Sequence, residues 1–305
     1  MKTLYRYRFA EAEAVRLIVP GETVTVEFPD SDGLGADLQA LPGELFEGGT
    51  ASGGNPVFGP IAVEGAEPGD ALRVHFLKVE PNRRIARTWL GPDHGFLPDA
   101  ALGVTKAEHM YHWEVSDGLA RISNLLGAKE VVIPVNPFLG CVATATDAAL
   151  SSMLAGDHGG NIDHPDLVAG TSLCLPVSQA GGLLYLGDMH AAQGQGETAG
   201  GGLEISGTAT IRVELYKGLK LAGPRYQTPE GIGCLGVGAD MAGATRTALA
   251  NMIEWLAGAG WNTCDAQMLV SQICAFRMGA VAERYAVVSC FLPQSSLIGD
   301  FTPWP

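Results

Sequence analysis

The chain has 305 residues, of which 47% are hydrophobic and 17% are charged. This composition fits a compact globular protein and excludes extensive disorder. Acidic residues outnumber basic residues by 33 to 19, which gives a formal net charge of −14. Because this charge repels phosphate backbones and anionic lipid, we expect neither a nucleic-acid partner nor a membrane partner.

The sequence shows no targeting or membrane-spanning signal. Residues 1–9 are partly basic, but no apolar segment with a cleavage site follows them. No uninterrupted apolar run reaches the roughly 18 to 20 residues that span a bilayer. The cysteines form no C-x-x-C pair, so we expect small buried groups in a reducing compartment. These features predict a soluble, cytoplasmic protein.

Short strands dominate the first part of the chain. Residues 22–28 alternate polar with apolar side chains and predict a half-buried strand, and a long loop over 30–60 rich in Gly and Pro follows. Residues 71–79 predict another strand, with Leu72 and its i+2 neighbours facing the core and with Arg73 and His75 outside. Further strand-like runs cover residues 130–135, 172–177 and 207–215.

The period changes to that of a helix near the C-terminus. Apolar residues recur at three-to-four-residue steps over 239–257, and again over 265–278 behind the potential cap Thr263, before 285–291 returns to β. We therefore predict one domain over residues 1–305. Its fold is mixed α/β and β-dominated, with a barrel-like β core and a helical pair near the C-terminus.

Polar residues concentrate between residues 157 and 204. His158 precedes two glycines, Gly159 and Gly160, which let the backbone approach a ligand closely, and then Asn161. If the strand that starts near Leu183 continues, alternation places Asp188 and His190 on one face, so both can reach one ion. A flexible glycine-containing loop then carries Glu197, and Glu204 follows.

This group of residue types predicts metal-assisted hydrolysis. A carboxylate and two imidazoles suit zinc or another borderline divalent ion, and we expect His158, Asp188 and His190 as its ligands. The alternative is that these three residues cap turns and bond backbone. For the other histidines we expect structural roles, although His94 could also approach a site from its loop; they are His75, His94, His109, His112 and His164.

Two other chemistries find no support in the sequence. No Gly-x-Ser-x-Gly elbow occurs, and the glycine-rich segments lack the Lys-Ser/Thr ending of a phosphate loop. The cysteines lack a matched base, so a thiol nucleophile is not expected either.

Several segments resemble the acetamidase/formamidase family. They include Gly54-Asn55-Pro56 with Gly59-Pro60, residues 63–72, and His158-Gly159-Gly160-Asn161-Ile162-Asp163. The longest is Leu186-Gly187-Asp188-Met189-His190-Ala191-Ala192-Gln193-Gly194-Gln195-Gly196-Glu197. With the C-terminal helical pair and residues 287–293, the resemblance spans most of the chain.

The resemblance implies hydrolysis of short-chain amides such as formamide or acetamide to carboxylate and ammonia. It also implies a β-rich fold, a homo-oligomer and a divalent metal, often zinc in related proteins. We expect Glu197 to act as the proton shuttle, with Glu204 and Glu64 in reserve and with Asn161 in the catalytic group. Asn55, Gly159 and Gly160 are expected to bind the substrate.

Two departures from the family pattern lie near this predicted site. Asp157 stands where the family pattern predicts Pro, and Gly200-Gly201-Gly202 stands where a bulkier stretch is expected before Glu204. These departures leave a lactam, a carbamoyl compound or a larger amide open as the substrate. A non-catalytic protein that binds a metal or a small amide is the alternative function.

Overall fold

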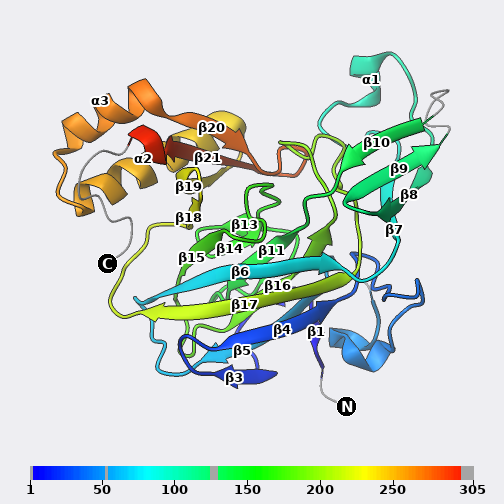
Figure 1. The fold of residues 1–305 in the computed structure, drawn as a ribbon, viewed down its shortest axis with the longest axis horizontal. Helices are drawn as coiled ribbons and strands as arrows, with labels where there is room; N and C mark the ends of the chain where they lie inside the picture. The colour runs from blue at the N-terminus through cyan, green and yellow to red at the C-terminus, as the bar shows by residue number, and fades with distance from the viewer. Residues whose placement is uncertain (1–2, 52–53, 124–129, 297–305) are drawn as a thin grey trace.

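Two large β-sheets face each other across one hydrophobic core (Figure 1). The structure is a computed structural model that describes residues 3–51, 54–123 and 130–296. The predicted fold, mixed and dominated by β-structure, is confirmed. Within the described residues neither sheet closes on itself, so the core is barrel-like without being a complete barrel.

The first large sheet carries the polar residues singled out above. Its central strand, β16 (Leu184–His190), pairs antiparallel with a strand on each side. The order is β1 (Tyr5–Arg6), β5 (Val57–Val63), β16, β11 (Phe138–Thr144), β14 (Gly159–Asn161) and β13 (Ala155–Gly156), with β3 (Arg16–Ile18) parallel to β5. All residues of β11 and β16 are buried, because both faces of these strands are covered.

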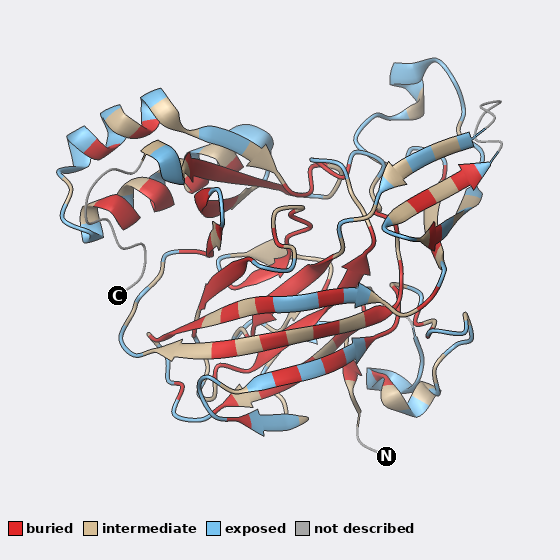
Figure 2. Cartoon of the chain, viewed as in Figure 1, coloured by how far each residue is buried: buried red, intermediate tan, exposed pale blue. Residues whose placement is uncertain are grey.

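The second large sheet contains most of the strands predicted by alternation. In β4 (Thr23–Phe28), exposed and buried residues alternate without exception, and Figure 2 shows similar banding on neighbouring strands. The order is β20 (Ala275–Met278), β21 (Ala286–Pro293), β19 (Gly231–Gly238), β18 (Arg225–Thr228), β15 (Ser172–Pro176), β6 (Ala71–Pro81), β17 (Gly207–Tyr216) and β4.

The prediction for β6 holds for its inward face and needs correction for its outward face. Leu72 and its i+2 neighbours are buried. Arg73 and His75 are not solvated, because neighbouring strands supply partners: Arg73 donates to Gln227 at 2.7 Å, and His75 Nε2 lies 3.0 Å from Glu214 Oε2.

A smaller sheet stands at one end of the two large ones (Figure 1). It consists of β7 (Ile85–Leu90), β8 (His109–Ser116), β9 (Leu119–Ser123) and β10 (Glu130–Pro134). The connection from β7 to β8 contains the short helix α1 (Asp99–Leu102). A further two-stranded pair joins β2 (Arg8–Phe9) and β12 (Leu150–Ser151).

The helical pair lies on the C-terminal strands. α2 (Met241–Gly258) packs its buried face against β19 and β21, and α3 (Thr263–Ile273) completes that small core. The second predicted helix is corrected at both ends. Its cap is Asn262, whose side chain accepts from Cys264 N at 2.9 Å, and residues 275–278 form β20, which pairs with β21.

The predicted loop over residues 30–60 leaves the core and returns to it at β5. It contains the 3-10 turns η1 (Gly43–Leu45) and η2 (Glu47–Gly49); a third, η4 (Gln294–Ser296), follows β21. Among the described residues, no helix is long and apolar enough to cross a bilayer.

Candidate active site

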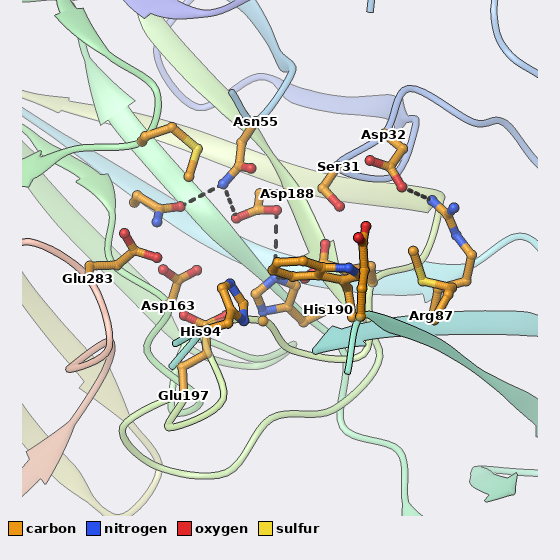
Figure 3. Close-up of a pocket in the computed structure, with 18 residues that line it drawn as sticks. Ser31, Asp32, Asn55, Arg87, His94, Asp163, Asp188, His190, Glu197 and Glu283 are labelled. Carbon is orange, nitrogen blue, oxygen red and sulfur yellow. Dashed lines mark hydrogen bonds and ion pairs between the residues drawn. The ribbon is translucent and has the colours of Figure 1, made fainter. Parts of the chain in front are cut away.

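The end of β16 forms the centre of a deep acidic pocket. Asp188 and His190 are both buried, and His190 Nε2 lies 3.6 Å from Asp188 Oδ1. The loop after β4 supplies Asn55, whose Nδ2 donates to Asp188 Oδ2 at 2.7 Å and to Asn161 Oδ1 at 2.9 Å (Figure 3). Asn55 therefore fixes one oxygen of Asp188 and leaves the other turned toward His190.

Glu204 reaches His190 because its backbone joins two sheets. It forms an isolated bridge with His190 at the end of β16 and another with Arg87 on β7, where Arg87 N donates to Glu204 O at 2.9 Å. This backbone position brings Glu204 Oε1 to 2.9 Å from His190 Nε2. Two carboxylates, Asp188 and Glu204, thus converge on one imidazole nitrogen.

Asp163 and Glu197 complete the cluster from two loops. Both are buried, at 1% and 7% exposure, and each has a ligand atom within 4.8 Å of one on His190 and of one on the other. Asp188, His190 and Glu204 form a second such group. Three of these residues, Asp163, Asp188 and Glu197, have positive φ angles of 44°, 59° and 46°. Non-glycine residues adopt this conformation rarely, and it concentrates at functional sites.

Gly140 on β11 makes room for two of these carboxylates. A Cβ atom there would overlap a carboxylate oxygen of Asp163 and would lie 2.6 Å from Asp188 Oδ2. Any other residue at position 140 would therefore push Asp163 or Asp188 away. Gly140 was not singled out from the sequence, because nothing in its local pattern indicates that two distant aspartates meet over it.

Burial and mutual repulsion shift the pKa values of the cluster. Burial raises the pKa of Asp163 well above its usual value, and the nearby Glu197 and Asp188 raise it further. Burial likewise raises the pKa of Glu197 to about 8, and it raises the pKa of Glu204. Burial alone would lower the pKa of His190, but the Glu204 and Asp188 carboxylates hold that pKa well above its ordinary value. The cluster therefore favours bound positive charge, whether protons or a cation.

The wall of the pocket comes from the smaller sheet and from the loop after β4. Together they enclose a cavity of about 420 Å³ above the acidic cluster. Arg87 pairs with buried Asp30 at 2.5 Å and with Asp32 at 2.7 Å, and Figure 3 shows Arg87 and Asp32 at the far side of the pocket from Glu197. Other lining residues that the sequence analysis did not assign to the site include Ser31, Trp89, Glu108, Met110, Met153 and Glu283.

His94 belongs to this wall, so the structure favours the alternative that it approaches the site from its loop over a purely structural role. Its ring packs edge-on against Trp89, with centroids 4.2 Å apart, and it lines the pocket. The other predicted structural histidines lie elsewhere; for example, His164 Nε2 is 2.9 Å from Ser289 Oγ in the core.

The structure corrects the prediction of His158 as a metal ligand. Within the described residues, neither group of three close donors contains His158, and it does not line the pocket. Its ring packs against Phe9, with centroids 5.3 Å apart. Asn161 and Asp163 do reach the pocket, so the same motif supplies the site through different residues.

Three further predicted residues are also outside the pocket. Gly159 and Gly160 have φ angles of 92° and 102°, and a Cβ atom on either would overlap the carbonyl of Val142 or Leu154. Their role is close backbone packing, not substrate contact. Glu64 is exposed in the turn after β5 and does not line the cavity.

The cysteines follow the predicted pattern in part. Cys141, Cys174, Cys234 and Cys290 are buried, whereas Cys264 is exposed and Cys274 is partly exposed. Cys141 lies beneath the cluster, with Sγ 3.0 Å from Asn161 Oδ1. Burial, Asp188 and Asp163 raise the pKa of Cys141 well above its usual value, so this thiol stays protonated and is a poor nucleophile.

The fold and the pocket together define a β-rich protein that holds carboxylates and an imidazole at the base of a cavity. The chain belongs to the acetamidase/formamidase family, whose model matches residues 141–297. This match includes Asn161, Asp188, His190, Glu197 and Glu204.

Individual relatives agree with this assignment. A formamidase from Methylophilus methylotrophus is 30% identical, over 52% of this chain and 51% of that protein, so the chain spans about half the length of this relative. The crystal structure of an acetamidase from Yersinia enterocolitica has a TM-score of 0.85 and 29% identity, covering 97% of this chain and 90% of the other. That of a predicted acetamidase/formamidase from Thermoanaerobacter tengcongensis has a TM-score of 0.82 and 25% identity, covering 95% and 93%.

Proposed function

We propose that this chain hydrolyses the C–N bond of primary carboxamides, with a divalent metal ion held by the acidic cluster. One observation supports the proposed metal ion. In the described part of the chain, both carboxylate oxygens of Asp163 and Oε2 of Glu204 are buried without a hydrogen-bond partner. Buried carboxylate oxygens normally have partners, and a bound cation satisfies them. Membership of the acetamidase/formamidase family supports the amide as substrate.

The donor set suits an ion such as zinc. Carboxylate oxygens and one imidazole nitrogen are ligands for borderline divalent metals. Asp188, His190 and Glu204 offer one set of three donors, and Asp163, His190 and Glu197 offer the other. When bound there, a divalent ion would acidify water and polarise the amide carbonyl.

The side chains of the cluster would move the protons. Hydrolysis forms a bond from a water oxygen to the carbonyl carbon and breaks the bond to nitrogen, which leaves as ammonia only if it gains a proton. Burial raises the pKa of Glu197 to about 8, so its carboxyl group can donate a proton to the leaving nitrogen and then take up the proton that the attacking water loses. Asn55 donates to Asp188 and to Asn161, so Asn161 positions the amide group that holds Asp188 in place.

Formamide and acetamide are the smallest substrates that we propose. The relatives named above are called formamidase and acetamidase, which is the basis for testing these two amides first. Either amide can reach the cluster through a cavity of about 420 Å³.

Ammonia release by the purified protein tests this proposal. We expect turnover of formamide or acetamide, close to one equivalent of divalent metal per chain by elemental analysis, and loss of both after dialysis against a chelator. Added zinc should restore turnover. A protein that binds metal or amide but releases no ammonia would be a binding protein, and full turnover with less than about a tenth of an equivalent of metal would overturn the metal role.

A further inference from the structure

The pocket is much larger than formamide or acetamide. The cavity measures about 420 Å³. A water molecule occupies roughly 30 Å³ in the liquid, so the three heavy atoms of formamide need roughly 90 Å³. Cavities of several hundred Å³ typically bury ligands far larger than that. An amide bound at the cluster would therefore leave most of the space unfilled unless its acyl group is long.

Part of the cavity lining is apolar. Trp89 on β7 and Met110 on β8 are cross-strand partners that both line the cavity, and Met153 lines it as well. The Trp89 ring packs closely over Gly91, where a Cβ atom would lie 2.7 Å from Trp89 Cη2, and His94 packs edge-on against the ring. An indole with a thioether beside it favours an aromatic group.

The glycine run before Glu204 keeps this space open. A Cβ atom at Gly200 would lie 2.9 Å from His94 Cε1, so glycine there lets the His94 ring approach. Gly201 also lines the cavity, yet no heavy atom lies within 4 Å of a Cβ atom built on it. A side chain at position 201 therefore meets no steric barrier at the border between this cavity and a neighbouring one, which Gly201 also lines.

The charges of the wall exclude an anionic substituent. Arg87 is paired with Asp30 and Asp32, so its charge is already matched. Glu108 and Glu283 line the same cavity, and the acidic cluster lies at its base. An arm that carries a carboxylate would be repelled, whereas a neutral arm would not.

We propose that this chain acts on primary carboxamides whose acyl group carries a neutral, apolar arm of about the size of a phenyl ring. The carboxamide lies at the acidic cluster, and the arm lies against Trp89 and Met110. This inference rests on the proposed amide hydrolysis.

The experiment compares kcat/KM for formamide, acetamide, phenylacetamide and the monoamide of succinic acid. We expect phenylacetamide to exceed acetamide by at least about tenfold, the scale of burying one aromatic side chain. The succinic monoamide should be the poorest substrate of the four. Gly201→Leu should lower the ratio of phenylacetamide to acetamide by about tenfold or more, because the leucine occupies the space of the arm.

A matched control separates this effect from a general disturbance of the loop. Gly194 is in the same loop, also has no heavy atom within 4 Å of a built Cβ, and does not line this cavity, so Gly194→Leu should leave the ratio unchanged. Met110→Ala should lower the ratio of kcat/KM for phenylacetamide to that for acetamide, because it removes a contact with the arm and does not fill the space of the arm.

The outcomes distinguish the two proposals. If no amide in the series releases ammonia, the proposed hydrolysis itself is wrong. If formamide and acetamide are hydrolysed but phenylacetamide is neither hydrolysed nor competes with acetamide, only the large arm is wrong. A ratio that is the same in Gly201→Leu and in the unmodified protein would likewise overturn the placement of the arm.

Discussion

The Nδ1 atom of His190 lies 2.7 Å from Oε1 of Gln193. Gln193 Nε2 donates to the backbone carbonyl of Asp163 at 2.7 Å, and a carbonyl can only accept. The amide orientation of Gln193 is therefore fixed, and its Oε1 atom must accept a hydrogen from His190. His190 carries that hydrogen on Nδ1 and directs Nε2 toward Glu204 and Asp188. Gln193 thus orients the imidazole that both groups of donors share.

We predict that Gln193→Leu weakens metal binding by about tenfold to a hundredfold, the usual effect of removing a partner that orients a ligating histidine. The dissociation constant for zinc, measured by competition with a chelator, checks this. Gln195→Leu is the control, because Gln195 is exposed in the same loop and bonds only Met278 N among the contacts described. Equal zinc affinity in Gln193→Leu and Gln195→Leu would contradict the orienting role.

Glu197→Gln should lower kcat by about a hundredfold to ten-thousandfold, because the amide group cannot deliver a proton to the leaving nitrogen. The KM and the metal content should change little. Steady-state kinetics with elemental analysis on the same preparation separate the two roles available to Glu197. If the variant loses its metal, Glu197 is a ligand and not the shuttle.

Glu64→Gln provides the comparison for this variant. Glu64 is an exposed residue in a turn outside the cavity, so its substitution should leave kcat within about twofold. A loss of activity in Glu64→Gln, together with normal activity in Glu197→Gln, would reverse the assignment of the shuttle.

Alternation in the sequence was sufficient to predict the strands that have one buried face. β4 and β6 each present apolar residues at every second position over most of their length. The helix α2 was equally visible, because its buried residues follow the helical period. The end of α3 was not, because pairing of residues 275–278 with β21 overrides a pattern that continues the helix.

The candidate site was predictable only in part, for a physical reason. Asp188 and His190 lie on one strand, so their proximity follows from local geometry. Asp163 and Glu197 meet them through left-handed backbone turns and through the absence of a side chain at Gly140. Such long-range packing leaves no periodic signal. His158 and Asn161 are three residues apart, so their nearness in the sequence does not place them on one face of a strand, and the positive φ angles of the two glycines between them turn the chain further.

The connection from β7 to β8 carries exposed apolar side chains that a second subunit could cover. Phe96, Leu97, Leu102 and Val104 are each at least 50% exposed there, and Figure 2 shows the segment around α1 as exposed. Neighbouring exposed apolar side chains commonly mark a surface that a partner covers. We predict a homo-oligomer, as the family resemblance implied, and Leu102→Glu should weaken it. Light scattering checks this, and a monomer mass of 31.8 kDa at working concentrations would contradict it.

His158 is a buried, neutral histidine. Burial lowers its pKa to about 4, and its Nε2 atom has no hydrogen-bond partner in the described residues. In the unfolded chain a histidine binds a proton near pH 6.5. Between about pH 6.5 and pH 4 the unfolded state therefore binds the proton and the folded state does not. The contribution of neutral His158 to the free energy of unfolding is therefore complete above pH 6.5 and is lost as the pH falls toward 4.

We predict that His158→Phe makes the protein less sensitive to acid and leaves its metal in place. Phenylalanine can pack against Phe9 as the imidazole does, and it cannot take up a proton when the chain unfolds. The free energy of unfolding is measured with denaturant at pH 7 and at pH 5. Its decrease between these two pH values should be about 2 kcal/mol smaller in the variant than in the unmodified protein. His112→Phe, at an exposed position of β8, should keep the slope of the unmodified protein. The metal content of His158→Phe decides the other question. A folded variant that loses its metal would restore His158 as a ligand, whereas retained metal together with a shallower pH dependence would assign this residue to the core.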